Sequence, residues 1–127
     1  MSDTTTEGIR IRVKPAFWGE RTVPEKSQWA FSYTVIITND GSRAATLRRR
    51  HWVITDAAGH VEEIKGDGVV GKQPRLEPGE SFEYTSYAML KTPFGSMHGK
   101  YYFERNDGSE VIAVIGEFAL TQPNALN

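Results

Sequence analysis

The chain has 127 residues, enough for one domain with a sizeable core, and 39% of them are hydrophobic, including six Phe, five Tyr and three Trp. Fifteen basic and 16 acidic residues give a formal net charge of −1, which argues against a protein dedicated to nucleic acid or to charged membrane surfaces. The sequence contains no cysteine, which excludes disulfides, thiolate catalysis and cysteine-ligated zinc sites.

No apolar run approaches the roughly 18 residues that a membrane-spanning helix needs. The first residues, MSDTTTEG, lack the basic and apolar regions of a signal peptide. We therefore expect a cytoplasmic protein with no membrane span. The polar ends are predicted to be a disordered N-terminal tail at residues 1–7 and a C-terminal tail at 121–127, on either side of one folded domain at 8–120.

The first predicted strand is an alternation of apolar and charged residues that begins at Ile9. After an irregular loop from Pro15 to Gln28, aromatic and β-branched residues alternate again from Trp29 to Ile37. Turn residues such as Asn106-Asp107-Gly108 separate the later extended segments. The predicted strands cover residues 9–13, 29–37, 47–55, 60–65, 81–87, 99–105 and 109–120, with the charged segment 60–65 at a sheet edge.

No segment shows a sustained apolar period of 3.6 residues, so the chain is predicted to be all-β. Short strands at regular spacing, without helices between them, favour an antiparallel β-sandwich of about seven strands. Because side chains alternate along a strand, the run Tyr101-Tyr102-Phe103 cannot bury all three aromatic rings on one face. At least one of these rings is expected at the outer surface or beneath a loop.

Gly66, Gly68 and Gly71 form a G-x-G-x-x-G pattern, which in dinucleotide-binding proteins follows a strand and opens a helix that holds the pyrophosphate. A strand before the pattern is plausible, but Pro74 and Pro78 exclude the helix after it. Two interpretations remain open. The glycines supply positive φ or a bulge in a turn between strands, or their N–H groups form an anion-binding nest without a helix.

The run from Arg48 to His51 contains three consecutive arginines. Side chains alternate along a strand, so we expect Arg50 to share a face with Trp52 while Arg49 shares the face of Leu47. Most of these guanidinium groups are expected to be solvated or paired with glutamates. A sharper hypothesis places Arg50 beside the loop at residues 66–71, which we call the glycine loop. There, its planar donors would suit a phosphate.

Catalytic and metal-binding patterns are not found. His51, His60 and His98 match no zinc-site spacing, and no calcium-loop pattern, nucleophile elbow or distinctive acid–base pair is present. We therefore predict that the protein is not an enzyme and has no cofactor and no metal site of recognisable pattern. A metal site assembled from distant strands stays open at this point.

Three ordered motifs together resemble the ApaG family. They are R-x-W-x-I-T-D-x-x-G at residues 50–59, G-x-G-V-V-G-x-Q-P-x-L-x-P-G-E-x-F-x-Y-T-S at 66–86 and T-P-x-G-x-M-x-G-x-Y at 92–101. The resemblance extends over roughly residues 9–120. One departure is Tyr87, which stands where the family pattern leads us to expect a glycine after Y-T-S.

The resemblance implies a fibronectin type III-like or immunoglobulin-like sandwich with no established catalytic activity. Bacterial members of the family are associated with cobalt resistance and magnesium efflux, and often lie genetically near a diadenosine tetraphosphate hydrolase. The same domain occurs in eukaryotic F-box proteins and in a DNA-polymerase-delta-interacting protein, where it looks like a protein-interaction module.

Our leading hypothesis is a non-enzymatic binding domain that acts through a protein partner and is linked to divalent-cation (Co²⁺ and Mg²⁺) homeostasis. The alternative is a sensor or carrier of a small phosphate-containing anion, pyrophosphate or a dinucleoside polyphosphate, bound at the glycine loop. Either way, the candidate surface lies around that loop, because loops on a rigid sandwich generally carry recognition. The candidate binding residues are Arg50, Trp52, Gly66, Gly68, Gly71, Lys72, Gln73 and Pro74.

Overall fold

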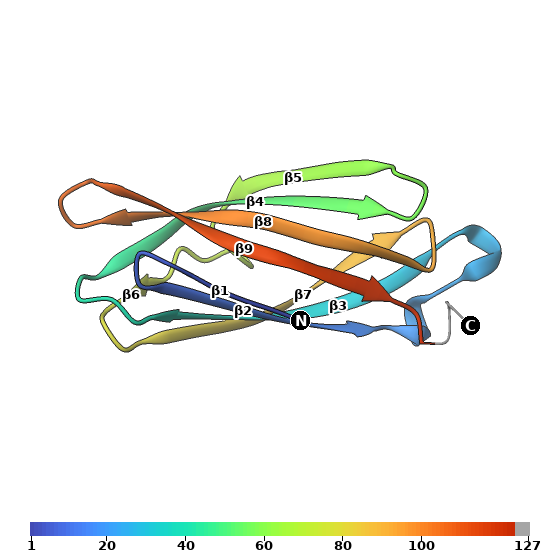
Figure 1. Cartoon of the computed structure of the whole chain (residues 1–127), viewed down its shortest axis with the longest axis horizontal. Coiled ribbons are helices and arrows are strands. Elements are labelled where there is room, and N and C mark those ends of the chain that lie inside the picture. The colour runs from blue at the N-terminus through green and yellow to red at the C-terminus, as the bar shows by residue number, and fades with distance from the viewer. Residues whose placement is uncertain (124–127) are drawn as a thin grey trace.

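The computed structural model describes residues 1–123 and shows two antiparallel β-sheets packed face to face (Figure 1). One sheet has the strand order β1-β2-β3-β7 and the other has the order β5-β4-β8-β9, with the short strand β6 also paired to β4. The strands are β1 (Ser2–Thr6), β2 (Ile9–Phe17), β3 (Trp29–Asn39), β4 (Ala45–Asp56), β5 (Val61–Asp67), β6 (Arg75–Leu76), β7 (Ser81–Leu90), β8 (Phe94–Arg105) and β9 (Glu110–Thr121).

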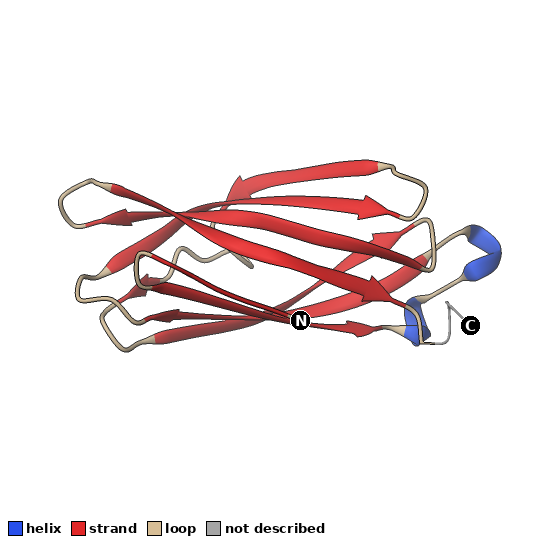
Figure 2. Ribbon diagram, viewed as in Figure 1, coloured by secondary structure: helices blue, strands red, loops and turns tan. Residues whose placement is uncertain are grey.

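This architecture confirms the predicted antiparallel β-sandwich and is consistent with a fibronectin type III or immunoglobulin-like fold. Residues 1–123 form nine strands instead of about seven, because β1 and the two-residue β6 lie outside the predicted segments. Figure 2 shows that strands dominate the described chain and that helical structure is confined to two short turns, η1 (Gly19–Arg21) and η2 (Pro24–Lys26). Neither turn has the length or apolar character that crossing a membrane would require.

The core is the apolar layer between the two sheets, and Trp52 of β4 lies within it with 2% of its surface exposed. Its ring lies 5.2 Å from that of Tyr33 on β3, 6.1 Å from that of Tyr101 on β8 and 6.0 Å from that of Phe118 on β9. Burying side chains of this size contributes about 1.5–3 kcal/mol each. Most of the alternating residues predicted to face inward on β2 and β3 are buried in the same layer, namely Ile9, Ile11, Val13, Phe31, Tyr33, Val35 and Ile37. Trp29, at the start of β3, is partly buried and packs against this core.

The expectation of a disordered N-terminal tail is wrong, because Ser2–Thr6 forms β1, which pairs with β2. A two-residue turn at Glu7 and Gly8 joins the strands, and both residues have positive φ (45° and 85°), as a type I′ hairpin turn requires. The hydroxyl of Thr6 accepts a hydrogen bond from the backbone N–H of Val114 at 3.2 Å. Strand β1 therefore lies against β9 of the other sheet and shields that side of the sandwich.

The C-terminal end of the domain is reached later than predicted, since β9 includes Thr121. The indole N–H of Trp29 donates a hydrogen bond to the Gln122 side chain at 3.2 Å, so Gln122 also has a defined contact. The rest of the predicted C-terminal tail, residues 124–127, lies outside the described residues. The irregular loop after β2 is also shorter than predicted, because β2 continues through Pro15 to Phe17.

A β-bulge in β4 changes which arginines face inward. The pairing register between β4 and β8 shifts between Leu47 and Arg49. Leu47 and Trp52 are consequently both buried although they are an odd number of positions apart. The expectation that Arg49 shares the face of Leu47 is therefore wrong, because the extra residue at the bulge places Arg49 on the outer face.

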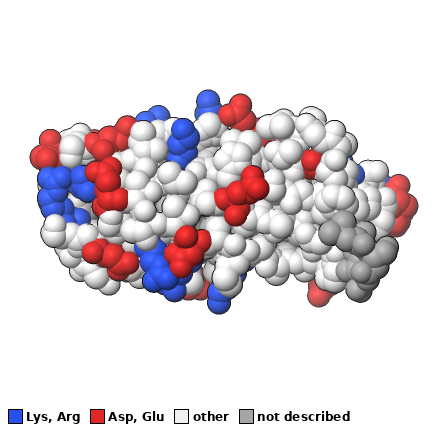
Figure 3. Space-filling model, viewed as in Figure 1, with Lys and Arg blue, Asp and Glu red and all other residues white. Residues whose placement is uncertain are grey.

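Charged side chains of both signs are interspersed on the face seen in Figure 3, where no continuous basic surface is visible. This distribution agrees with the formal net charge of −1. In β8 the alternation separates the aromatic run as expected. Tyr101 and Phe103 are fully buried, and Tyr102 lies on the outer face.

Candidate functional site

The glycine loop is a tight hairpin closed by its own backbone. The N–H of Val69 donates to the carbonyl of Lys72 at 2.8 Å, and the N–H of Lys72 donates back at 2.9 Å. Val70 and Gly71 form the tip with φ of 45° and 76°, again the signs of a type I′ turn. The N–H of Gly68 donates to the carbonyl of Arg48 at 2.8 Å. Three of the loop's N–H groups are thus used internally, which favours the structural interpretation of the glycines over an open nest.

Gly68 is the position in the loop where a side chain fits least. Its φ is +58°, and a Cβ atom would lie 2.1 Å from the carbonyl oxygen of Lys72. Gly71 differs, because its φ of +76° favours glycine but a Cβ atom would meet no atom within 4 Å. The first glycine, Gly66, belongs to β5 and pairs with Arg50. The three glycines of the pattern therefore differ in role: Gly66 lies in a strand, Gly68 leaves no room for a side chain, and Gly71 has a positive φ.

Arg50 lies beside the glycine loop, as the sequence suggested, but it is bonded to the loop itself. Its Nη1 donates to the carbonyl oxygens of Asp67 and Gly68, both at 2.9 Å. The guanidinium also covers Gly66, where a Cβ atom would lie 2.9 Å from its carbon. Arg50 thus holds the start of the loop against β4, and the Nη1 group of its guanidinium is already hydrogen-bonded.

The remaining candidate residues are spread from the surface into the core. Lys72 is exposed near the loop tip. The Gln73 side chain donates to the carbonyl of Arg48 at 3.0 Å, and the carbonyl of Pro74 accepts from the N–H of Leu47 at 2.9 Å. Trp52 is buried, so it supports the site from beneath and presents no surface to a ligand. The structure therefore brings Arg50, Gly66 and Gly68 together and separates Trp52 from them by its burial.

A buried tyrosine pair lies between the sheets. The hydroxyls of Tyr84 on β7 and Tyr101 on β8 are hydrogen-bonded to each other. Burial raises the pKa of both groups well above the ordinary value for tyrosine, and the same cause raises the pKa of Tyr33. These hydroxyls remain protonated at neutral pH and act as structural groups.

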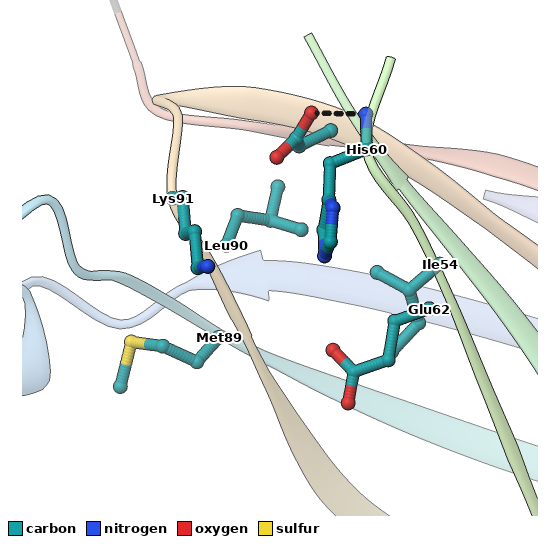
Figure 4. A pocket seen from close by; sticks show the side chains of 7 residues that line it. Ile54, His60, Glu62, Met89, Leu90 and Lys91 are labelled. Atoms are coloured by element: carbon teal, nitrogen blue, oxygen red, sulfur yellow. Dashed lines mark hydrogen bonds between the residues drawn. The ribbon is translucent and has the colours of Figure 1, made fainter. Parts of the chain in front are cut away.

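His51 on β4 and His98 on β8 lie on neighbouring strands, two positions apart in the register, while His60 lies in the turn before β5. A small pocket of about 40 Å³ opens between the two sheets where Ile54, His60 and Glu62 face Met89, Leu90 and Lys91 (Figure 4). The carboxylate of Asp56 at this pocket accepts the backbone N–H groups of Ala58 and His60, both at 2.9 Å, and so stabilises the turn before β5. Within residues 1–123 no three His, Asp or Glu side chains converge in a way that could hold a metal ion.

Among residues 1–123, β7 pairs only with β3, which leaves its other edge free. Sequence reasoning did not identify this free edge. Tyr87 and Met89 of this strand are 67% and 43% exposed. The Tyr87 ring meets that of Trp18 edge-on at a centroid distance of 6.1 Å. Beside them lies an aromatic groove of about 330 Å³, lined by Phe17, Trp18, Ser32, Thr85, Ser86 and Tyr87. The departure at Tyr87 was the one sequence signal that pointed to this surface.

Comparison with known proteins agrees with the motifs and the fold. The family described as the ApaG domain matches residues 19–105. The chain belongs to the ApaG family. It is 51% identical to the Protein ApaG of Anaeromyxobacter dehalogenans (strain 2CP-C) over 127 residues, which cover all of both chains. It is 49% identical to the Protein ApaG of Ralstonia nicotianae (strain ATCC BAA-1114 / GMI1000) over 119 residues, 94% of this chain and 96% of the relative.

A solved structure supports the ApaG fold independently. The crystal structure of an ApaA protein from Bordetella pertussis superposes on this chain with a TM-score of 0.88 at 45% sequence identity. The superposition covers 91% of this chain and 94% of the other. The family resemblance seen in the three ApaG motifs is thereby confirmed.

Proposed function

We propose that this ApaG-family protein is a non-enzymatic, cytoplasmic binding domain that acts through a protein partner in Co²⁺ and Mg²⁺ homeostasis. The observation that carries the proposal is the free edge of β7 beside the aromatic groove. The link to divalent cations rests on the associations of the family, and we assign it to the partner.

Strand β7 has few of the features that protect edge strands from pairing. Its ten residues, SFEYTSYAML, include one charged side chain and no proline, glycine or lysine. The edge strand of the other sheet, β5, is VEEIKGD, in which four of seven residues are charged. Exposed backbone N–H and C=O groups along β7 can therefore accept an extended segment of a partner as an added strand.

The aromatic groove would supply side-chain specificity to that contact. Tyr87 projects from the outer face of β7 and packs edge-on against Trp18, while the Arg21 guanidinium lies 5.4 Å from the centre of the Trp18 ring. Tyrosine, tryptophan and arginine are the residue types that contribute most often to binding energy at protein interfaces. We propose that the partner places an apolar side chain against Tyr87 and Trp18.

The glycine loop is a second candidate contact for the same partner. Val70 at its tip is 54% exposed and Lys72 follows it. The alternative function, a sensor or carrier of pyrophosphate or a dinucleoside polyphosphate at this loop, has less support. Its Gly68, Val69 and Lys72 N–H groups are bonded within the protein, and Nη1 of Arg50 is bonded to loop carbonyls.

The test is affinity capture from extract of the source cells with the full chain and two matched variants. Tyr87→Lys adds a charge at the proposed contact, and Val61→Lys adds the same charge to an exposed position on β5. We expect a protein retained by the wild type and by Val61→Lys to bind Tyr87→Lys at least about tenfold more weakly. Equal retention by all three chains, or no retained protein, would contradict the proposal. Loss of binding in a further variant, Val70→Lys, with binding by Tyr87→Lys unchanged, would move the contact to the glycine loop.

A further inference from the structure

The outer face of the sheet β5-β4-β8 contains a basic groove with no role in the function proposed above. It has a volume of about 450 Å³ and is lined by Arg49, Arg50, His51, Lys65, Gly66, Asp67, Lys100 and Tyr102. Four of these residues are cations at neutral pH and one is a carboxylate. We propose that this basic groove binds a small phosphate-containing anion between Lys65 and Lys100.

The strand register places both lysines directly beside one histidine. His51 on β4 pairs with Lys65 on β5 and with Lys100 on β8. Directly paired residues project from the same face, and three neighbouring strands span roughly 10 Å at their Cα atoms. Two flexible lysine side chains can therefore converge on one anion above His51.

Within the part of the chain that the structure describes, the two lysines have no partner, unlike the nearby arginines. Arg48 pairs with Glu104 at 3.1 Å, Arg49 pairs with Glu110 at 3.3 Å, and Arg50 is bonded to loop carbonyls. Among residues 1–123, the ammonium groups of Lys65 and Lys100 take part in no ion pair or side-chain hydrogen bond. Their donors are thus available to an external oxyanion.

The other lining residues give the groove a defined floor and wall. The His51 side chain is only 16% exposed and is bonded to the Glu63 carboxylate at 2.8 Å. The Arg49 guanidinium lies 4.4 Å from the centre of the Tyr102 ring, a cation–π contact that holds the two side chains together. The floor is therefore held in place before any ligand arrives, and the two lysines are the side chains free to move onto it.

This groove is separate from the tip of the glycine loop and from β7. Gly66 contributes to its lining, but Gly68, Gly71 and Lys72 do not. The ligand class follows from the donors: two ammonium groups suit a compact anion with several charged oxygens, such as phosphate or pyrophosphate. Anion binding in the basic groove is therefore independent of partner binding at β7.

The experiment is an amide NMR titration of the full chain with pyrophosphate, repeated with sulfate at matched ionic strength. We expect saturable shifts confined to residues 49–51, 64–67 and 99–102, and weaker or absent saturation with sulfate. Lys65→Ala and Lys100→Ala should each raise the Kd about five- to tenfold, as loss of one charge-assisted contact would. Both variants change exposed side chains, and unchanged amide spectra outside the groove would show that they fold.

The matched control is Lys72→Ala, which removes a lysine near the glycine loop tip and should leave the Kd within about twofold. Three results would overturn the proposal: no saturable shifts, a Kd unchanged in the Lys65→Ala/Lys100→Ala double variant, or shifts of equal size and spread with sulfate. A loss of binding in Lys72→Ala alone would assign the anion to the glycine loop instead.

Discussion

The hydroxyl of Tyr84 on β7 and the hydroxyl of Tyr101 on β8 are bonded to each other in the interior, where one strand of each sheet faces the other. One hydroxyl donates and the other accepts, so each of the two buried oxygens has a hydrogen-bond partner. The pair also fixes how the two sheets lie on each other, because the bond forms at only one relative position of the strands.

This pairing predicts strong coupling between the two tyrosines. Tyr101→Phe and Tyr84→Phe should each cost about 1–3 kcal/mol of unfolding free energy, because each leaves a buried hydroxyl unpaired. The double Phe variant should cost clearly less than the sum of the two. Urea denaturation of all four proteins gives the coupling energy, and additive costs would show that the two hydroxyls do not depend on each other.

Substitutions at Gly68 and Gly71 of the glycine loop should lower the stability of the fold by different amounts. Gly68→Val should destabilise the fold severely, because a Cβ atom there lies 2.1 Å from the Lys72 carbonyl oxygen and the backbone has positive φ. Gly71→Ala, with open space around the new Cβ atom, should cost only about 1 kcal/mol from its positive φ. Thermal unfolding compares the two directly. A Gly68→Val protein of normal stability would overturn the structural role of that glycine.

The tip of the same loop predicts a stabilising change. Val70 is β-branched yet has a φ of 45°, a region that such residues rarely adopt. Asparagine is favoured at this position of a type I′ turn, so Val70→Asn should raise the unfolding free energy by about 1 kcal/mol. Val114→Asn, another exposed valine but in a regular strand, is the control and should not stabilise. If Val70→Asn destabilises the protein, Val70 must have a contact that relieves its strain.

In the hairpin between β8 and β9, the carboxylate of Asp107 should titrate at an unusually low pH. The side chain of Asp107 accepts the hydroxyl and the N–H of Ser109, and these bonds with the nearby Arg43 lower its pKa to about 2. A lowered pKa means that this contribution to stability is fully present above about pH 4 and is lost as the pH falls toward 2. Carbon-detected NMR of the Asp107 carboxylate should show this pKa, and Ser109→Ala should raise it toward the ordinary value. An unchanged pKa in Ser109→Ala would exclude the serine as its cause.

The strands with apolar alternation were predictable, as in the segments that begin at Ile9 and Trp29, because burial on one face imposes a period of two. Strand β1 was not, because its sequence SDTTT has no apolar side chain and its order comes from pairing with β2 and packing on β9. The bulge near Arg48 was equally hidden, since nothing in the local sequence marks the extra residue.

The candidate site was predictable in part. The proximity of Arg50 to the glycine loop followed from an antiparallel return of the chain. The internal use of the loop's N–H groups did not, because it depends on the exact turn geometry. The row formed by Lys65, His51 and Lys100 can be recognised only when the pairing register of β5, β4 and β8 is known. Lys100 also lies far from the other two residues in the sequence. No local motif could have shown it.

Strands β1 and β7 lie at opposite ends of one sheet, and β1 is the end that is shielded by β9. If two copies of the chain pair along β7, a two-fold axis relates them and the β7 edges of both copies are used in a single contact. The edge that remains on that side, β5, is charged and resists the same pairing. Association of this protein with itself would therefore stop at a closed dimer and would not grow into fibres.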